Sequence, residues 1–215
     1  MPPPDRPLPI DLALVLAIDV SGSMSEHRLR LQLQGYIDAF RSAALARAVR
    51  QGARGRIAAT LVEWSDYGRQ DQTVDWTLIA DRAGARGFAD AVARSTLAGP
   101  GWTSLSGAIG FSTALLADGR FRAARKVIDI SGDGVNNDGP PPALLRDRAV
   151  AAGITINGLP IVEPDPALAA YYRNNVIGGP DAFVEVATDL ESFAGAVLRK
   201  LIVEVSRRHP RAAFG

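Results

Sequence analysis

The sequence predicts an α/β fold: a doubly wound, mostly parallel sheet of six strands, with one antiparallel edge strand and helices on both faces. Short apolar runs alternate along the chain with segments whose apolar residues recur at helical spacing, a pattern typical of such folds. Leu12–Ile18 is an unbroken apolar run and therefore predicts a buried strand. Only a short link, residues 65–71, separates the second and third predicted strands. Because this link is too short for a helical crossover, the two strands must form an antiparallel hairpin at one edge.

The composition is that of an ordinary globular protein. The chain has 215 residues, of which 47% are hydrophobic, so it is long enough for one sizeable core. We expect a single domain over residues 10–208, after a proline-rich lead-in at 1–9 and before a tail at 209–215. The formal net charge is +1 and acidic residues are interleaved with the arginines, so we expect no nucleic-acid partner. Cysteine is absent, which excludes disulfides, thiolate nucleophiles and cysteine-ligated metals.

The hydropathy pattern predicts no membrane insertion, because the longest apolar run is much too short to cross a bilayer. The first residues lack the charged and then apolar layout of a secretory leader, although a chain trimmed of its leader would look the same. The sequence pattern therefore leaves the compartment open.

Helical spacing predicts the first helix from about Glu26 to about Arg50, and glycines shortly after it end it. The apolar residues on one face of this helix are Leu29, Leu33, Tyr36, Ile37, Phe40 and Ala44. Arg56–Trp64 is the second predicted strand, and Gln72–Leu78, in which apolar residues alternate, is the third. Asp81–Ser95 is predicted to be helical despite two internal glycines.

A glycine-proline-glycine sequence makes residues 96–103 a loop, and the apolar spacing after it predicts a helix from Ser104 to about Asp118. Three consecutive prolines favour another helix start near residue 140. The remaining predicted elements are a fourth strand at 127–130, a helix at 143–152, a fifth strand at 154–159, a short helix within 164–175, a sixth strand at 183–186 and a terminal helix from 190 to about 207.

Oxygen-bearing side chains follow two of the predicted strands and precede one of the predicted helices. Asp19, Ser21 and Ser23 stand in a loop directly after the first strand. Thr103 stands directly before a helix, and Asp133 follows the fourth strand. If the first and fourth strands are neighbours, the three loops open on the same edge of the sheet, where ligands bind in such folds.

These five side chains are a suitable ligand set for a hard divalent cation such as Mg²⁺, because all of them are oxygen donors. The two carboxylates roughly neutralise the ion, and the three hydroxyl groups add no further charge. The cation then stays electrophilic enough to bind one more anionic oxygen from outside the chain.

The motif and the order of elements over about residues 12–207 resemble the von Willebrand factor type A superfamily, whose fold is Rossmann-like. Its metal-ion-dependent adhesion site has the pattern Asp-x-Ser-x-Ser, then a distant Thr and a distant Asp, and the five side chains match these roles one by one. The resemblance implies that they bind Mg²⁺, or Mn²⁺ or Ca²⁺ in its place, directly or through water. It also implies that an Asp or Glu carboxylate of a partner protein completes the shell.

Two departures from the superfamily pattern concern the choice of partner. The third loop is Ser-Gly-Asp-Gly where Thr-Asp-Gly is usual, and Trp102 precedes the threonine where glycine is common. Later segments are similar to a bacterial subgroup of the superfamily that has no assigned function and whose members are often secreted. This resemblance favours a periplasmic or secreted location if a signal peptide was trimmed. The segments are residues 156–160, Tyr171-Tyr172, residues 176–180 and Phe183-Val184.

Three of the site residues also have purely structural interpretations. Ser23 and Glu26 form a capping-box pattern, so the Ser23 hydroxyl could simply cap the first helix. Thr103 could serve only as an N-cap. Asp133-Gly134 is an ordinary turn dipeptide, although a helix start rather than a second strand follows it.

Aromatic and amide side chains in or beside the loops are candidates for partner contact, since aromatics are enriched at interaction hot spots. They are Trp64, Trp102, Asn136 and Asn137; for the tryptophans, and for the nearby Tyr67, packing is the alternative. Asp129 within the fourth strand predicts a buried structural partner such as arginine or tyrosine. His27, in the first turn of a helix, predicts a solvated side chain.

Three functions remain open. The first is a non-catalytic, divalent-metal-dependent module that captures an acidic side chain of another protein; it is favoured because the oxygen ligands come without a base, a nucleophile or a phosphate-binding loop. The second is Mg²⁺-dependent phosphoryl transfer or hydrolysis, since the two aspartates superficially resemble those of haloacid-dehalogenase-like phosphatases. In that comparison Ser21 replaces the second acid, and no lysine is expected near the site. The third is a structural domain with a vestigial metal site.

Overall fold

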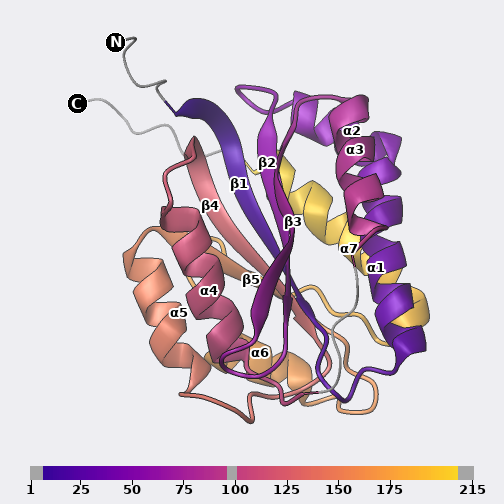
Figure 1. Cartoon of the computed structure of the whole chain (residues 1–215), viewed down its shortest axis with the longest axis vertical. Coiled ribbons are helices and arrows are strands. Elements are labelled where there is room, and N and C mark those ends of the chain that lie inside the picture. The colour runs from indigo at the N-terminus through magenta and orange to yellow at the C-terminus, as the bar shows by residue number, and fades with distance from the viewer. Residues whose placement is uncertain (1–6, 96–100, 208–215) are drawn as a thin grey trace.

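A computed structural model describes residues 7–95 and 101–207 and shows a mostly parallel sheet between two layers of helices (Figure 1). The strand order is β3-β2-β1-β4-β5. All neighbouring strands are parallel except β2 and β3, which form the antiparallel hairpin that the short link predicts. None of the described helices combines the length and hydropathy needed to cross a bilayer.

The strands are β1 (Leu8–Asp19), β2 (Ile57–Trp64), β3 (Gln70–Ile79), β4 (Phe121–Gly132) and β5 (Ile154–Pro160). The helices are α1 (Glu26–Arg41), α2 (Ala43–Arg50), α3 (Arg82–Val92), α4 (Leu105–Ala117), α5 (Pro142–Ala151), α6 (Leu168–Asn175) and α7 (Leu190–Ser206).

The side chains of β1 alternate between the two hydrophobic cores. Those of Leu12, Leu14, Leu16 and Ile18 pack with α1, α2, α3 and α7 on one face of the sheet. Those of Ala13, Val15 and Ala17 pack with α4, α5 and α6 on the other face. Because both faces are covered (Figure 1), every residue of this run is buried and none needs to be polar.

The order of the sheet reverses at β1. The chain passes from β1 through α1 and α2 to β2, which pairs with one edge of β1, whereas the later strand β4 pairs with the other edge. Ile18 lies opposite Ser131 in this pairing. The loops that follow β1 and β4 therefore leave the sheet side by side at the same end, which is the usual ligand crevice of doubly wound folds.

The predicted sixth strand at 183–186 is wrong, because the sheet has five strands among the described residues. Val184 and Ala187 form only isolated bridges, to Gly158 and Ile161. The Phe183 N–H donates to the side-chain Oδ1 of Asn157 at 3.1 Å instead of to a backbone carbonyl. Gly158 N donates to Phe183 O and Glu185 N donates to Gly158 O, but Pro160 has no N–H, so the ladder cannot continue there.

The single first helix predicted over Glu26–Arg50 is also wrong, because two helices meet at Ser42. This residue is extended (φ −69°, ψ 141°), and its hydroxyl accepts a hydrogen bond from Leu45 N at 3.1 Å, so it caps α2. The apolar spacing continues across the break and therefore conceals it.

β1 and β4 are much longer than predicted. β1 begins at Leu8, within the predicted lead-in at 1–9, because Leu8 pairs with Phe121 at the start of β4. β4 consequently begins well before Val127. Residues 1–6 of the lead-in, residues 96–100 of the predicted loop and the tail at 209–215 lie outside the described residues.

A buried ion cluster fastens α7 to β4 and β5. Lys200 Nζ lies 2.5 Å from Asp129 Oδ1 and 2.6 Å from Glu204 Oε1, and the same Oε1 accepts a hydrogen bond from Asn157 Nδ2 at 2.8 Å. All four side chains are buried. Asp129 thus has the structural partner that the sequence predicts, although it is a lysine. Burial, followed by the charge of Glu204, raises the pKa of Asp129 to about 7.

Lys200→Met should lower the free energy of unfolding by about 3–5 kcal/mol, because it leaves the carboxylates of Asp129 and Glu204 buried without a counter-charge. Denaturant titration at mildly alkaline pH measures this loss. Arg199→Met is the matched control, since the neighbouring Arg199 pairs with Glu185 at the surface and should contribute less than about 1 kcal/mol. Equal losses in the two variants would contradict the structural role of the cluster.

Candidate metal centre

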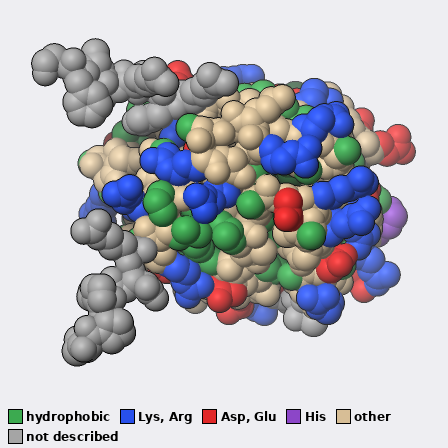
Figure 2. Space-filling model, turned by 90° about the horizontal axis from the view of Figure 1, so that it is seen from above, with side chains coloured by type: hydrophobic (Ala, Val, Ile, Leu, Met, Phe, Trp, Pro, Cys, Tyr) green, Lys and Arg blue, Asp and Glu red, His purple; other side chains and the backbone are tan. Residues whose placement is uncertain are grey.

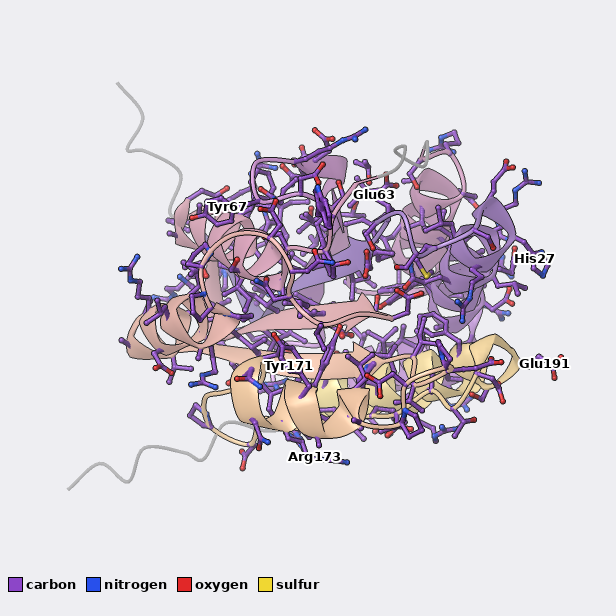
Figure 3. All side chains as sticks on the ribbon, turned by 90° about the horizontal axis from the view of Figure 1, so that it is seen from below. His27, Glu63, Tyr67, Tyr171, Arg173 and Glu191 are labelled. Atoms are coloured by element: carbon purple, nitrogen blue, oxygen red, sulfur yellow. The ribbon has the colours of Figure 1, made fainter. Side chains whose placement is uncertain are left out.

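The three loops that carry the predicted ligands converge at the carboxyl ends of β1 and β4. Figure 3 views the molecule from this end, with Tyr67 and Tyr171 on opposite sides of the face and His27 at its outer edge. Gly22 N donates to Gly101 O at 2.9 Å, which ties the first loop to the second. Asn137 N donates to Thr103 O at 2.9 Å, which ties the third loop to the second. The backbone itself therefore holds the three loops together.

A continuous chain of side-chain contacts joins four of the five predicted ligands. Thr103 Oγ1 lies 3.2 Å from Ser21 Oγ, and Ser21 Oγ lies 3.2 Å from Ser23 Oγ. Ser23 Oγ in turn donates to Asp133 Oδ1 at 2.6 Å. A hydroxyl group can rotate and present a lone pair to a cation, so these oxygens are close enough to share one ion.

The carboxylate of Asp19 completes the set from beneath. Its Oδ1 accepts a hydrogen bond from Ser21 N at 2.8 Å, whereas Oδ2 is buried and has no hydrogen-bond partner among the described residues. Burial raises the pKa of Asp19 to about 7; hydrogen bonds from Ser21 and from the backbone of Asp133 oppose this shift, and the charge of Asp133 adds to it. Burying a carboxylate oxygen without a hydrogen-bond donor costs folding free energy unless a cation binds that oxygen. The site therefore fits a hard divalent ion.

Glycine at position 132 allows this close packing. A Cβ at that position would lie 2.7 Å from Asp19 Oδ2 and 3.0 Å from Tyr172 Oη. The Tyr172 hydroxyl is also buried without a partner among the described residues, and burial raises its pKa well above the usual value. The sequence Ser-Gly-Asp-Gly of the third loop therefore has a steric reason for its first glycine.

Neither of the capping interpretations holds. Ser25, not Ser23, caps α1 by accepting a hydrogen bond from Arg28 N at 3.3 Å. Ser104, not Thr103, caps α4 by accepting from Gly107 N at 3.2 Å. Because Ser25 and Ser104 cap the two helices, the hydroxyl groups of Ser23 and Thr103 are free of capping and contact the other predicted ligands instead.

The four predicted partner-contact residues fall into three classes. Trp102 is 65% exposed and lies beside Thr103 at the surface. Trp64 is fully buried in the core, so it offers no surface to a partner and the packing alternative is correct. Asn137 Oδ1 accepts from Thr103 N at 2.7 Å, and Asn136 Oδ1 accepts from Ser106 N at 3.1 Å. The two asparagines therefore brace the third loop against α4.

Several residues that support the site were not predicted from the sequence. Arg28 Nη1 lies 3.5 Å from Asp133 Oδ2, and Trp102 N donates to Asp66 Oδ1 at 2.6 Å. Below the site, Gln32 Nε2 donates to Asp19 O at 3.1 Å, Ser131 Oγ donates to Gln32 Oε1 at 3.2 Å, and Tyr36 Oη donates to Ser131 Oγ at 3.2 Å. The one available signal was Gln32, a polar residue on the otherwise apolar face of the first predicted helix.

The described site combines carboxylate and hydroxyl oxygens. No group of three or more His, Cys, Asp or Glu side chains with metal-binding geometry occurs among the described residues, because this site has two carboxylates and otherwise hydroxyls. Both lysines of the chain lie away from it: Lys200 is in the buried cluster, and Lys126 lies opposite Ala13 and Ile154, toward the other end of the sheet. His27 is exposed, as expected for a solvated side chain (Figure 3).

Solved structures with the same fold include domains of a byssus thread matrix protein, a pilus adhesin and a pilus tip protein. Proximal thread matrix protein 1 from the mussel byssus, solved with a zinc-occupied MIDAS motif, is 13% identical over 91% of this chain and 46% of that chain, with a TM-score of 0.63. The pilus adhesin SpaC from Lactobacillus rhamnosus GG is 13% identical over 92% of this chain and 31% of its own, with a TM-score of 0.61. The von Willebrand factor domain of the pilus tip protein Mfa5 from Porphyromonas gingivalis is 13% identical over 94% and 98%, with a TM-score of 0.57.

This chain therefore spans less than half of the mussel protein and about a third of the pilus adhesin, and at these identities the likeness establishes the fold alone. No curated protein matches the sequence significantly. A family model described as "Protein of unknown function (DUF1194)" matches residues 9–209, which is nearly the whole chain. The chain belongs to this family, and its fold is that of a von Willebrand factor type A domain.

Proposed function

We propose that this chain is a non-catalytic binding module that uses a divalent cation, held by Asp19, Ser21, Ser23, Thr103 and Asp133, to capture a carboxylate of a partner protein. The observation that carries the proposal is the buried Asp19 Oδ2, which has no hydrogen-bond partner among the described residues and lies beneath linked hydroxyl and carboxylate groups. A cation there supplies the missing positive charge. With only two carboxylates as ligands, the ion keeps affinity for a third.

The surroundings of the site suit a partner protein that has an acidic side chain with an apolar side chain beside it. Arg28 lies beside Asp133 at the edge of the site and adds a second positive charge. Trp102 and Val135 are exposed on the second and third loops, and Trp102 offers a large apolar surface beside the cation. An exposed Asp or Glu next to an apolar side chain matches both features. A pilus adhesin has the same fold, which supports an interaction role.

Catalysis is the weaker alternative. Phosphoryl transfer needs a nucleophile, a general acid or a phosphate clamp near the metal, and the side chains around this site are mainly hydroxyls that already bond to one another. Ser21 stands where a phosphatase of the haloacid-dehalogenase type would have its second acid. A purely structural domain is also disfavoured, because it would gain stability by giving the carboxylate of Asp19 a partner.

The first test is metal binding. Mg²⁺ or Mn²⁺ should give a saturable isotherm with the wild-type chain and raise its melting temperature, because an ion that binds only the folded state stabilises it. Asp19→Ala combined with Ser21→Ala should abolish both effects. Ser25→Ala is the matched control from the same loop, since its hydroxyl caps α1, and it should bind metal as the wild type does. Absence of metal binding in the wild type would refute the proposal.

The affinity for Mg²⁺ should fall as the pH is lowered below 7. Burial raises the pKa of Asp19 to about 7, so in the metal-free chain a proton competes with the cation for this carboxylate below that pH. One displaced proton corresponds to a loss of about tenfold in affinity for each pH unit. Calorimetric titrations in a pH series measure the slope. A flat profile between mildly alkaline and mildly acidic pH would contradict Asp19 as a direct ligand.

The open coordination position can be tested with a simple carboxylate. With Mn²⁺ in the site, water-proton relaxation reports the exchangeable waters on the ion. Millimolar acetate should reduce this relaxation by displacing a water, whereas the same concentration of neutral acetamide should leave it unchanged. The Asp19→Ala, Ser21→Ala variant gives the background from free Mn²⁺. Equal effects of acetate and acetamide would leave metal binding intact but would refute carboxylate capture.

A further inference from the structure

A cavity of about 500 Å³ opens at the end of the sheet opposite the metal loops. It lies at the amino ends of β4 and β5, beneath the last turn of α7, and its volume is in the range of small-molecule sites. Val127, Val150 and Pro180 give it an apolar lining. Figure 2 views this end of the molecule and shows Lys and Arg side chains gathered around hydrophobic ones.

Three cationic residues, Arg125, Lys126 and Arg207, and two acidic residues, Asp181 and Glu204, line this cavity. Arg125 is partly buried, donates from Nη2 to Glu204 O at 2.5 Å, and forms no ion pair with any described residue. Burial lowers the pKa of Arg125; the charge of Arg207 acts in the same direction, and the charges of Glu204, Asp11 and Asp181 oppose it. Arg207 lies over the Phe183 ring at 4.5 Å and donates to Asp181 O, which fixes it at the wall. Lys126 is the third cation.

The cavity also presents a buried acceptor, the carboxylate of Glu204, which is 1% exposed. Its Oε1 is engaged by Lys200 and Asn157, which offset its charge. Its Oε2 has no hydrogen-bond partner among the described residues. The same wall therefore offers a cationic guanidinium and, close to it, an acceptor that a ligand's hydroxyl or N–H could satisfy.

We propose that this cavity binds a small organic acid with an apolar body and a hydroxyl or N–H donor beside its acid group. The acid group pairs with Arg125, and Lys126 and Arg207 add to the positive potential. The donor meets Glu204 Oε2, and the apolar body packs on Val127 and Val150. None of these residues belongs to the metal loops, so this binding needs no cation.

Calorimetry on the full chain in the presence of a chelator tests the proposal with three probes of one shape. Naphthaleneacetate should bind at least about tenfold more tightly than the cationic naphthalenemethylamine, because a charge-assisted contact distinguishes them. Naphthylglycolate, which adds a hydroxyl beside the acid, should bind about fivefold more tightly than naphthaleneacetate. Equal binding of acid and amine, or no binding of either acid at millimolar concentration, would overturn the proposal. Equal binding of the two acids would overturn the role of Glu204.

Variants locate the site. Arg125→Met should weaken naphthaleneacetate binding by about tenfold, whereas Arg122→Met, an exposed arginine on the same strand, should leave it unchanged. If Arg125→Met lowers the melting temperature, Lys126→Met provides the second charge variant and should weaken binding in the same direction. Equal weakening by Arg122→Met would overturn the assignment. The Asp19→Ala, Ser21→Ala variant should bind the acid as the wild type does, which separates this result from the metal proposal.

Discussion

The parallel pairing of β1 with β4 is the constraint on which the rest of the structure depends. It brings Ile18 opposite Ser131, so the loop that carries Asp19 and the loop that carries Asp133 leave the sheet together although they are far apart in sequence. The same pairing makes β1 the central strand, buried by helices on both faces. A register shift by one residue would exchange the two faces of the strand and separate the loops.

The polar groups beneath the metal loops connect the site to the packing of α1. Gln32 on α1 donates to the backbone oxygen of Asp19 and accepts from Ser131, which in turn accepts from Tyr36 one helical turn further along. These side chains are fully buried, so their hydrogen bonds must be satisfied internally. The orientation of α1 on the sheet is therefore coupled to the position of Asp19, and packing changes along this helix reach the site.

Much of the fold and of the candidate site followed from local patterns. The unbroken apolar run of β1, the short link before β3 and the Asp-x-Ser-x-Ser spacing each depend on neighbouring residues, and sequence shows these directly. What failed depends on contacts between distant segments. Ser42 ends α1 although the apolar spacing continues, and the 183–186 segment contacts β5 only through an isolated bridge. The burial of Trp64, the partner of Asp129 and the cavity beneath α7 likewise arise only when the helices pack on the sheet.

Two buried aspartates in this sheet show why the unpartnered one is informative. Burial raises the pKa of both Asp19 and Asp129 to about 7, because desolvation disfavours the ionised form of each carboxyl group. Asp129 has Lys200 at 2.5 Å as its counter-charge, supplied by a helix that packs over the same strand. Asp19 has hydroxyl and backbone neighbours and the charge of Asp133 nearby, and one of its oxygens has no donor among the described residues. The fold neutralises one such carboxylate with a lysine and leaves the other beside hydroxyl groups. Because local folding rules are broken mainly at functional sites, this difference supports the proposal that a cation from outside binds at Asp19.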